Sequence, residues 1–173
     1  SAWTAHTMEN TLPQVLDMSC YAADRNGVEW FGTKSMGLWR FDGSAWKNYT
    51  SPDGLPEGWL RTLTVDRDNI LWISSYMGFA AFDGHSFSTF PDGPDTTISS
   101  IAVDRDNRKW IGTIGEGLWC YDGNRWEQYT SENSALIDDR VYEVAIDADD
   151  TKWLIAYSFH FLFRFSDEGW KWY

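Results

Sequence analysis

The sequence predicts an all-β protein built from four similar units, because the same short phrase occurs four times along the chain. Each copy opens with a tryptophan and continues with small or apolar residues, at 30–33, 72–75, 110–113 and 153–156. A second phrase, which begins with glycine and ends in Asp-Gly, follows the first three copies, at 37–43, 78–84 and 117–123. Repeats of about forty residues with four short apolar runs are typical of β-propeller blades. We therefore expect a β-propeller of about four four-stranded antiparallel blades, either closed alone or forming part of a larger or oligomeric ring.

A single domain is expected over residues 1–173, since a chain of 173 residues has the length of one ordinary domain. The turn residues between the apolar runs place the four blades near 15–50, 59–91, 97–130 and 140–173. Residues 1–7 repeat the outermost strand of a blade, since Ser1-Ala2-Trp3 matches Ser44-Ala45-Trp46. This extra outer strand leaves two arrangements open. Either the four blades close alone, or a homodimer completes an eight-bladed ring and covers the exposed blade faces.

The charge and composition exclude several classes of partner. The formal net charge is −12, whereas nucleic acids and anionic membrane surfaces require clustered lysine and arginine. The acidity indicates solubility, with a cationic ligand as the alternative. No apolar run approaches the ~20 residues of a membrane-spanning helix, so no membrane insertion of this chain is expected. Cys20 and Cys120 fall in different repeats and are expected as free thiols that pack as small apolar residues. No motif indicates a cofactor or a metal.

The first apolar run of each unit ends in aspartate and predicts the innermost strand of a blade. Counted back from that aspartate, positions −6, −3 and −1 are mostly apolar and positions −4 and −2 mostly small, as in 98–104. The four residues that start with the aspartate predict a tight hairpin turn, because Asp and Asn bond their own backbone and tolerate left-handed geometry. A calcium loop is the alternative, but the glutamate that it needs at its twelfth position is absent in all four copies.

Most aromatic residues are predicted to form the core. They make up 17% of the chain. The second and third runs of each unit are apolar at nearly every position, which indicates a sheet covered on both faces. Each ring then buries ~150–250 Å² between blades. In the last run two aromatic residues stand three apart, as do Trp126 and Tyr129. Because this spacing does not fit a period of two, it predicts a bulge or twist in the outermost strand.

The repeated phrases resemble the two-component regulator propeller repeat. The stretches that carry the resemblance are 24–42, 66–83, 104–122 and, more loosely, 147–165, together with Gly54-Leu55-Pro56. Well-known members of that family form the extracytoplasmic sensor regions of bacterial hybrid histidine kinases, which detect oligosaccharides or related small ligands. The resemblance implies a ligand-sensing module for a carbohydrate or another small ligand, located in the periplasm or outside the cell. Such sensors usually carry many more blades, a small β-domain, a membrane segment and a kinase, which are not found in these 173 residues.

Candidate ligand-binding residues are those that depart from the repeat near the mouth of the channel. In a propeller the turns between the second and third strands share one edge with the loops that enter the first strands, and ligands usually bind there. The turn at 157–160 departs most, because it is one residue longer than its counterparts and rich in aromatic side chains. Four large residues also break the rule of small residues in or beside the first strands. The candidates are Tyr76, Glu116, Tyr157, Phe159 and His160 in the turns, and Trp59, Arg61, Tyr142 and Glu143 in or beside the first strands.

Three classes of function fit this pattern. A non-enzymatic ligand-sensing module follows from the family resemblance and is the interpretation that we favour. A protein–protein interaction scaffold is the first alternative, because exposed aromatic patches also mark interfaces. The second alternative is a propeller lyase that uses His160, with Glu116 as its partner in acid–base chemistry. The catalytic motifs His-Glu-x-x-His and Gly-x-Ser-x-Gly are absent.

Overall fold

The computed structural model describes residues 17–156 and 161–173, and these form four sheets of four strands each. The first sheet contains β1 (Met18–Ala23), β2 (Glu29–Thr33), β3 (Leu38–Phe41) and β4 (Trp46–Tyr49). The second contains β5 (Leu60–Val65), β6 (Leu71–Ser75), β7 (Phe79–Phe82) and β8 (Phe87–Thr89). The third contains β9 (Ile98–Val103), β10 (Lys109–Thr113), β11 (Leu118–Tyr121) and β12 (Trp126–Tyr129). The fourth contains β13 (Val141–Ile146), β14 (Lys152–Ala156), β15 (Phe161–Ser166) and β16 (Gly169–Trp172). A single turn of 3-10 helix, η1 (Ser51–Asp53), follows β4.

Each sheet is an antiparallel meander whose strands pair in chain order, which confirms the predicted all-β fold of four-stranded blades. The turn between the first two strands is closed by its aspartate. In the third blade Asp104 Oδ1 accepts hydrogen bonds from the backbone N–H groups of Asp106 at 3.0 Å and Arg108 at 2.8 Å. Asn107 closes the turn in the left-handed region, with φ of 64°. The predicted hairpin turn is therefore confirmed, and the aspartate bonds its own backbone as expected.

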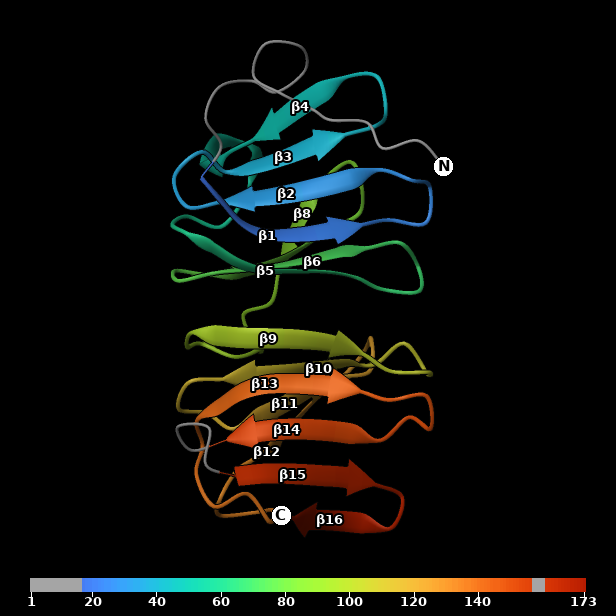
Figure 1. Ribbon diagram of the computed structural model, residues 1–173. Coiled ribbons are helices and arrows are strands. Elements are labelled where there is room, and N and C mark those ends of the chain that lie inside the picture. The colour runs from blue at the N-terminus through green and yellow to red at the C-terminus, as the bar shows by residue number, and fades with distance from the viewer. Residues whose placement is uncertain (1–16, 157–160) are drawn as a thin grey trace.

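The four blades form an open arc. Their innermost strands follow one another, with β1 packed on β5, β5 on β9 and β9 on β13. In Figure 1 the outer strands of the first and fourth blades extend to opposite ends of the molecule, and β5 and β9 separate β1 from β13. Within the part of the chain that the structure describes, β1 and β13 do not pack on each other. Of the two arrangements that the sequence leaves open, a ring closed by four blades alone is thus not the one observed.

Each innermost strand carries a bulge. The pairing of β1, β5, β9 and β13 with the following strand shifts register five residues before the aspartate of the turn. This extra residue explains why the apolar positions are spaced by three and then by two. In two blades the extra residue is a serine that bonds the next blade: Ser19 Oγ donates to the carbonyl of Leu60 at 2.6 Å, and Ser99 Oγ to that of Val141 at 2.5 Å. The bulged residue is Arg61 in the second blade and Tyr142 in the fourth. The bulge therefore leaves these two candidate site residues out of the pairing with the neighbouring strand.

Of the bulge or twist predicted for the outermost strand, the bulge is wrong. β11 and β12 pair in regular register, so residues three apart point to opposite faces. Trp126 packs against Phe79 and Phe90 of the preceding blade, with ring centroids 6.3 and 5.8 Å apart. Tyr129 packs against Phe165 of the following blade, with centroids 5.5 Å apart. The spacing of three therefore lets one short strand supply a ring to each of two blade interfaces.

A carboxylate, an indole and a lysine meet at two of the three blade interfaces. Asp66 Oδ2 accepts a hydrogen bond from Trp72 Nε1 at 2.9 Å and pairs with Lys109 Nζ of the next blade at 3.0 Å, with both charged side chains buried. The arrangement recurs one blade further on, at Asp104, Trp110 and Lys152. Burial alone raises the pKa of the Asp66 carboxyl, but the bonds from Trp72, the backbone and Lys109 outweigh it and hold the pKa below its usual value. We call this arrangement the Asp–Trp–Lys clasp.

The hydrophobic core lies between neighbouring blades. Trp30, Trp72 and Trp110 are at most 4% exposed, as the core prediction requires. Cys20 and Cys120 are free thiols, in agreement with their predicted role. In the described residues no helix has the length and apolar character needed to cross a membrane.

Candidate functional site

The turns between the second and third strands meet the loops that enter the first strands along one edge of the arc. Backbone hydrogen bonds fix this meeting in each of the first three blades. Lys34 N donates to Asp17 O at 3.0 Å, Tyr76 N to Trp59 O at 3.2 Å, and Ile114 N to Thr97 O at 2.9 Å. Large side chains placed at these positions therefore share one surface.

Three candidate residues, Trp59, Arg61 and Tyr76, come together on this edge. Trp59 directly precedes β5, Arg61 is the bulged residue of β5, and Tyr76 directly follows β6. The rings of Trp59 and Tyr76 are 5.6 Å apart at 57°, and they are 40% and 48% exposed. Large aromatic side chains that remain this exposed beside each other are typical of binding surfaces.

Two cations lie over these rings. The guanidinium of Arg61 is 4.7 Å from the centre of the Tyr76 ring, and Lys34 Nζ is 4.8 Å from the centre of the Trp59 ring. Such cation–π contacts hold the long side chains in place. Lys34 also pairs with Asp17 at 3.4 Å, in a solvent-exposed position. Among the described residues no carboxylate lies within ion-pair distance of Arg61. Arg61 is thus a cation without a carboxylate partner among the described residues, whereas the charge of Lys34 is offset by Asp17.

These side chains line an open cleft of about 420 Å³ between the first and second blades. We call it the Trp59–Tyr76 cleft; its lining residues are Met18, Ser19, Lys34, Trp59, Arg61 and Tyr76. Its size lies within the range of small-ligand sites. Its lining combines two aromatic rings and a methionine with the polar side chains Ser19, Lys34 and Arg61.

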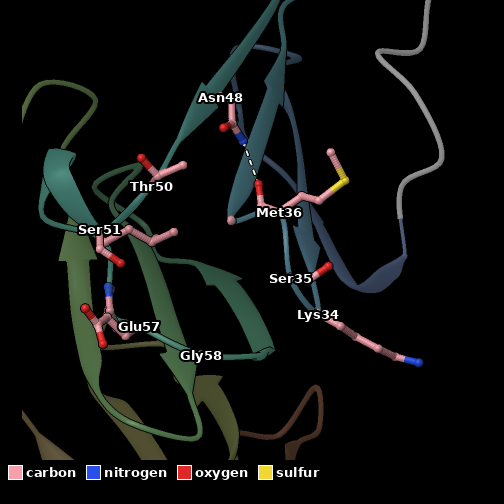
Figure 2. Close-up of a pocket in the computed structure, with 11 residues that line it drawn as sticks. Lys34, Ser35, Met36, Asn48, Thr50, Ser51, Glu57 and Gly58 are labelled. Carbon is pink, nitrogen blue, oxygen red and sulfur yellow. Dashed lines mark hydrogen bonds between the residues drawn. The ribbon is translucent and has the colours of Figure 1, made fainter.

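A second hollow of about 310 Å³ adjoins the cleft through Lys34. Figure 2 shows its polar wall, where Asn48 Nδ2 donates to the carbonyl of Met36 at 2.9 Å, and it shows the Lys34 side chain extending away from that wall. Ser51 and Glu57 stand on the opposite side, on the loop that leads toward β5. On the far side of Tyr76 lies a third hollow of about 410 Å³. The cleft therefore has a neighbouring hollow on each side, one sharing Lys34 with it and the other sharing Tyr76.

The remaining candidates lie elsewhere or outside the described residues. Tyr142 and Glu143 belong to β13, two blades away from β5, and partial burial raises the pKa of the Glu143 carboxyl. Glu116 sits in the β10–β11 turn, where its carboxylate accepts a hydrogen bond from the backbone N–H of Asp95 at 3.4 Å. The turn with the strongest sequence signal, formed by Tyr157, Phe159 and His160, lies outside the described residues.

Sequence reasoning missed Lys34 and Met18. Lys34 occupies the same position in the first blade as Tyr76 in the second, directly after the second strand. A comparison of this position between blades shows a lysine in the first and a tyrosine in the second, and this difference could have identified Lys34 as a site residue. Met18 opens β1 and is 43% exposed, and no departure from the repeat distinguishes it.

The fold was compared with known proteins. The extracellular domain of the putative hybrid two component system BT3049 from B. thetaiotaomicron has a TM-score of 0.72 at 17% identity, over 88% of this chain and 22% of that chain. The extracellular domain of the putative one component system BT4673 from the same organism has a TM-score of 0.76 at 17% identity, over 94% of this chain and 22% of that chain. A streptogramin B lyase has a TM-score of 0.75 at 14% identity, over 93% of this chain and 56% of that chain. No protein-family model and no curated protein sequence matches the chain.

These likenesses define the class of fold. The chain is an array of propeller blades of the kind found in the extracellular domains of two-component and one-component systems. This result supports the two-component regulator propeller repeat that the sequence resembles. The chain spans less than a quarter of the length of those two domains.

Proposed function

We propose that this chain is a non-enzymatic ligand-binding module of an extracytoplasmic sensor, and that it binds a carbohydrate or another small ligand in the Trp59–Tyr76 cleft. The fold supports the sensor role, because extracellular domains of two sensor systems share it. The same likeness supports a location in the periplasm or outside the cell.

The observation that carries the proposal is the pair of exposed rings held by cations. An aromatic ring offers a flat apolar face that suits the C–H face of a sugar ring, while its polar neighbours bond the hydroxyl groups. Trp59 and Tyr76 supply two such faces, 5.6 Å apart at 57°. The hollows that adjoin the cleft at Lys34 and at Tyr76 provide room for further sugar units.

The cations favour a ligand with negative charge. Lys34 and Arg61 both lie against the rings, so a carboxylate or sulfate on a stacked sugar would be within their reach. Arginine binds such groups with two parallel hydrogen bonds, which adds direction as well as strength. We therefore propose acidic oligosaccharides as the preferred class.

A binding array tests the proposal. Wild-type protein is applied to neutral and acidic oligosaccharides, and each hit is repeated with Trp59→Ala. Trp172→Ala is the matched control, because Trp172 is 65% exposed on β16, far from the cleft. We expect binding to fall at least tenfold for Trp59→Ala and to persist for Trp172→Ala. An equal response of both variants would place binding elsewhere, and silence of the whole array would remove the sensor role for carbohydrates.

Two other functions have support and separate tests. A lyase is the second candidate, since a streptogramin B lyase shares the fold; incubation with a streptogramin B antibiotic, followed by mass spectrometry of wild type and His160→Ala, tests it. A protein-binding scaffold would use the same exposed rings. It predicts a protein partner whose capture requires Trp59, together with silence on the oligosaccharide array.

A further inference from the structure

The outer face of the fourth blade repeats part of the interface that the second and third blades form with the blades that follow them. Asp147 Oδ2 accepts a hydrogen bond from Trp153 Nε1 at 2.8 Å, as Asp66 and Asp104 do from their own tryptophans. Trp153 also packs on Tyr173, with ring centroids 6.1 Å apart. The described residues thus supply the carboxylate and the indole of an Asp–Trp–Lys clasp there, but no lysine that pairs with Asp147.

In the described interfaces, a hydrogen bond from the tryptophan to the turn aspartate occurs where the next blade supplies a buried lysine. Asp66 and Asp104 bind their tryptophans, and in both cases the second strand of the next blade begins with a buried lysine. In the first blade the indole N–H of Trp30 is buried without a hydrogen-bond partner, and the next second strand begins with Leu71. The lysine is present where the carboxylate accepts the indole, because a buried carboxylate needs a cation.

A second contact accompanies every junction between blades. The N–H of the residue after the turn aspartate donates to the side chain at the fourth turn position of the next blade. The three pairs are Arg25 with Asn69 at 2.9 Å, Arg67 with Asn107 at 2.8 Å, and Arg105 with Asp150 at 2.8 Å. In the fourth blade the equivalent donor is the N–H of Ala148.

We propose that the outer face of the fourth blade is a docking surface for a propeller blade of defined chemistry. That blade has lysine at the start of its second strand and Asn or Asp at the fourth position of its first turn. The lysine would pair with Asp147, and the Asn or Asp would accept from Ala148. The exposed Leu162 and Tyr173, which occupy the register positions of the interface residues Leu118 and Tyr129, would supply the apolar contact.

The first blade of a second copy does not have this chemistry. Its second strand begins with Glu29, which would bring a carboxylate toward Asp147. Its turn has Gly27 at the fourth position, which has no side chain to accept from Ala148. Like charges brought together in an interface cost affinity. The homodimer that the sequence allows is therefore disfavoured at this face, and a blade with the stated residues is its partner.

The proposal is tested by giving the first blade the missing residues. Gly27 has φ of 78°, close to the 65° of Asn69, and an added side chain would meet nothing within 4 Å. Gly27→Asn with Glu29→Lys therefore installs both groups, and the asparagine takes a left-handed turn position that Asn69 and Asn107 already occupy in the next two blades. We expect wild-type protein to have the monomer mass of 20.0 kDa. The double variant should self-associate head to tail at least tenfold more tightly, as measured by sedimentation equilibrium.

Two further variants make the result specific. Glu29→Gln removes the negative charge without adding a lysine and should associate no more tightly than the wild type. Asp147→Asn in the double variant keeps an acceptor for Trp153 but removes the charge, so it should abolish the gain. Circular dichroism verifies that each variant is folded. A folded double variant that stays monomeric would overturn the proposal, as would a wild-type dimer that Asp147→Asn dissociates, because a second copy would then be the partner.

Discussion

Replacing Lys109 by methionine removes the cation that neutralises Asp66 between the second and third blades. The two side chains are 6% and 2% exposed, and Lys109 Nζ lies 3.0 Å from Asp66 Oδ2. Lys109 also donates to the carbonyl of Asn107 at 2.8 Å and covers the Trp72 ring at 5.0 Å. The methionine keeps most of the volume of the side chain, so the variant tests the charge more than the packing.

The expected loss follows from what Asp66 retains. Removing one partner of a buried ion pair typically costs ~3–5 kcal/mol, because a charge is left without compensation. Asp66 still accepts hydrogen bonds from Trp72 Nε1 and from the backbone of Asp68 and Ile70. Those bonds reduce the penalty, so we expect the free energy of unfolding to fall by about 2–3 kcal/mol.

Urea unfolding followed by tryptophan fluorescence measures this loss. The control is Lys171→Met, which breaks a solvent-exposed pair with Glu168 and should cost much less than the loss of the buried pair. The pH dependence adds a second readout. The folded pKa of Asp66 lies below its unfolded value of ~3.9, so its stabilisation is present above that pH and is lost as the pH falls through the folded pKa. The difference between wild type and Lys109→Met should therefore shrink below about pH 4. A loss no larger than that of the control would refute the reasoning.

Three other predictions concern the core, a buried thiol and the Trp59–Tyr76 cleft. Phe82→Ala should lower the free energy of unfolding by ~3–5 kcal/mol in urea titrations, because Phe82 is 1% exposed and packs on Trp30 and Tyr49; a loss below 1 kcal/mol would contradict its role in the core. Burial raises the pKa of Cys120 to about 12, so this thiol should stay unreactive toward Ellman's reagent at pH 8 until urea unfolds the chain. Arg61→Gln should weaken the binding of acidic oligosaccharides more than that of neutral ones of the same length. Titration calorimetry measures both affinities, and an equal loss of affinity for the two classes would contradict the proposed preference for acidic ligands.

The repeat made most of the fold predictable. Each blade carries its own turn aspartate, its tryptophan and its aromatic pair, so local sequence determines each meander without long-range information. The spacing of Trp126 and Tyr129 predicts a bulge in the outermost strand only if both side chains belong to one face. They belong to two interfaces, and a spacing of three is regular for residues that point to opposite sides.

The opening of the arc could not be predicted in the same way. Closure depends on the small rotation between neighbouring blades, and no single residue encodes that angle. The partners across interfaces were hidden for a related reason. Lys109 and Lys152 look like ordinary exposed strand ends in the sequence, and only the packed blades show that each is buried against the aspartate of the preceding blade.

The candidate site was predicted in part. Trp59, Arg61 and Tyr76 break the repeat in the sequence, and the structure brings them together because the β5 bulge and the β6–β7 turn lie on one edge. Glu116 and Tyr142 also break the repeat, but they belong to other blades. A departure from a repeat marks a position along the chain, whereas a site requires that such positions fall on neighbouring blades.

The most direct test of the central claim is a comparison of ligand binding between wild type and Trp59→Ala on one array of acidic and neutral oligosaccharides. Binding to the Trp59–Tyr76 cleft predicts that acidic oligosaccharides bind the wild type, that Trp59→Ala loses at least tenfold in affinity, and that Trp172→Ala binds as the wild type does. Wild-type binding that Trp59→Ala leaves unchanged would contradict the assignment of the cleft.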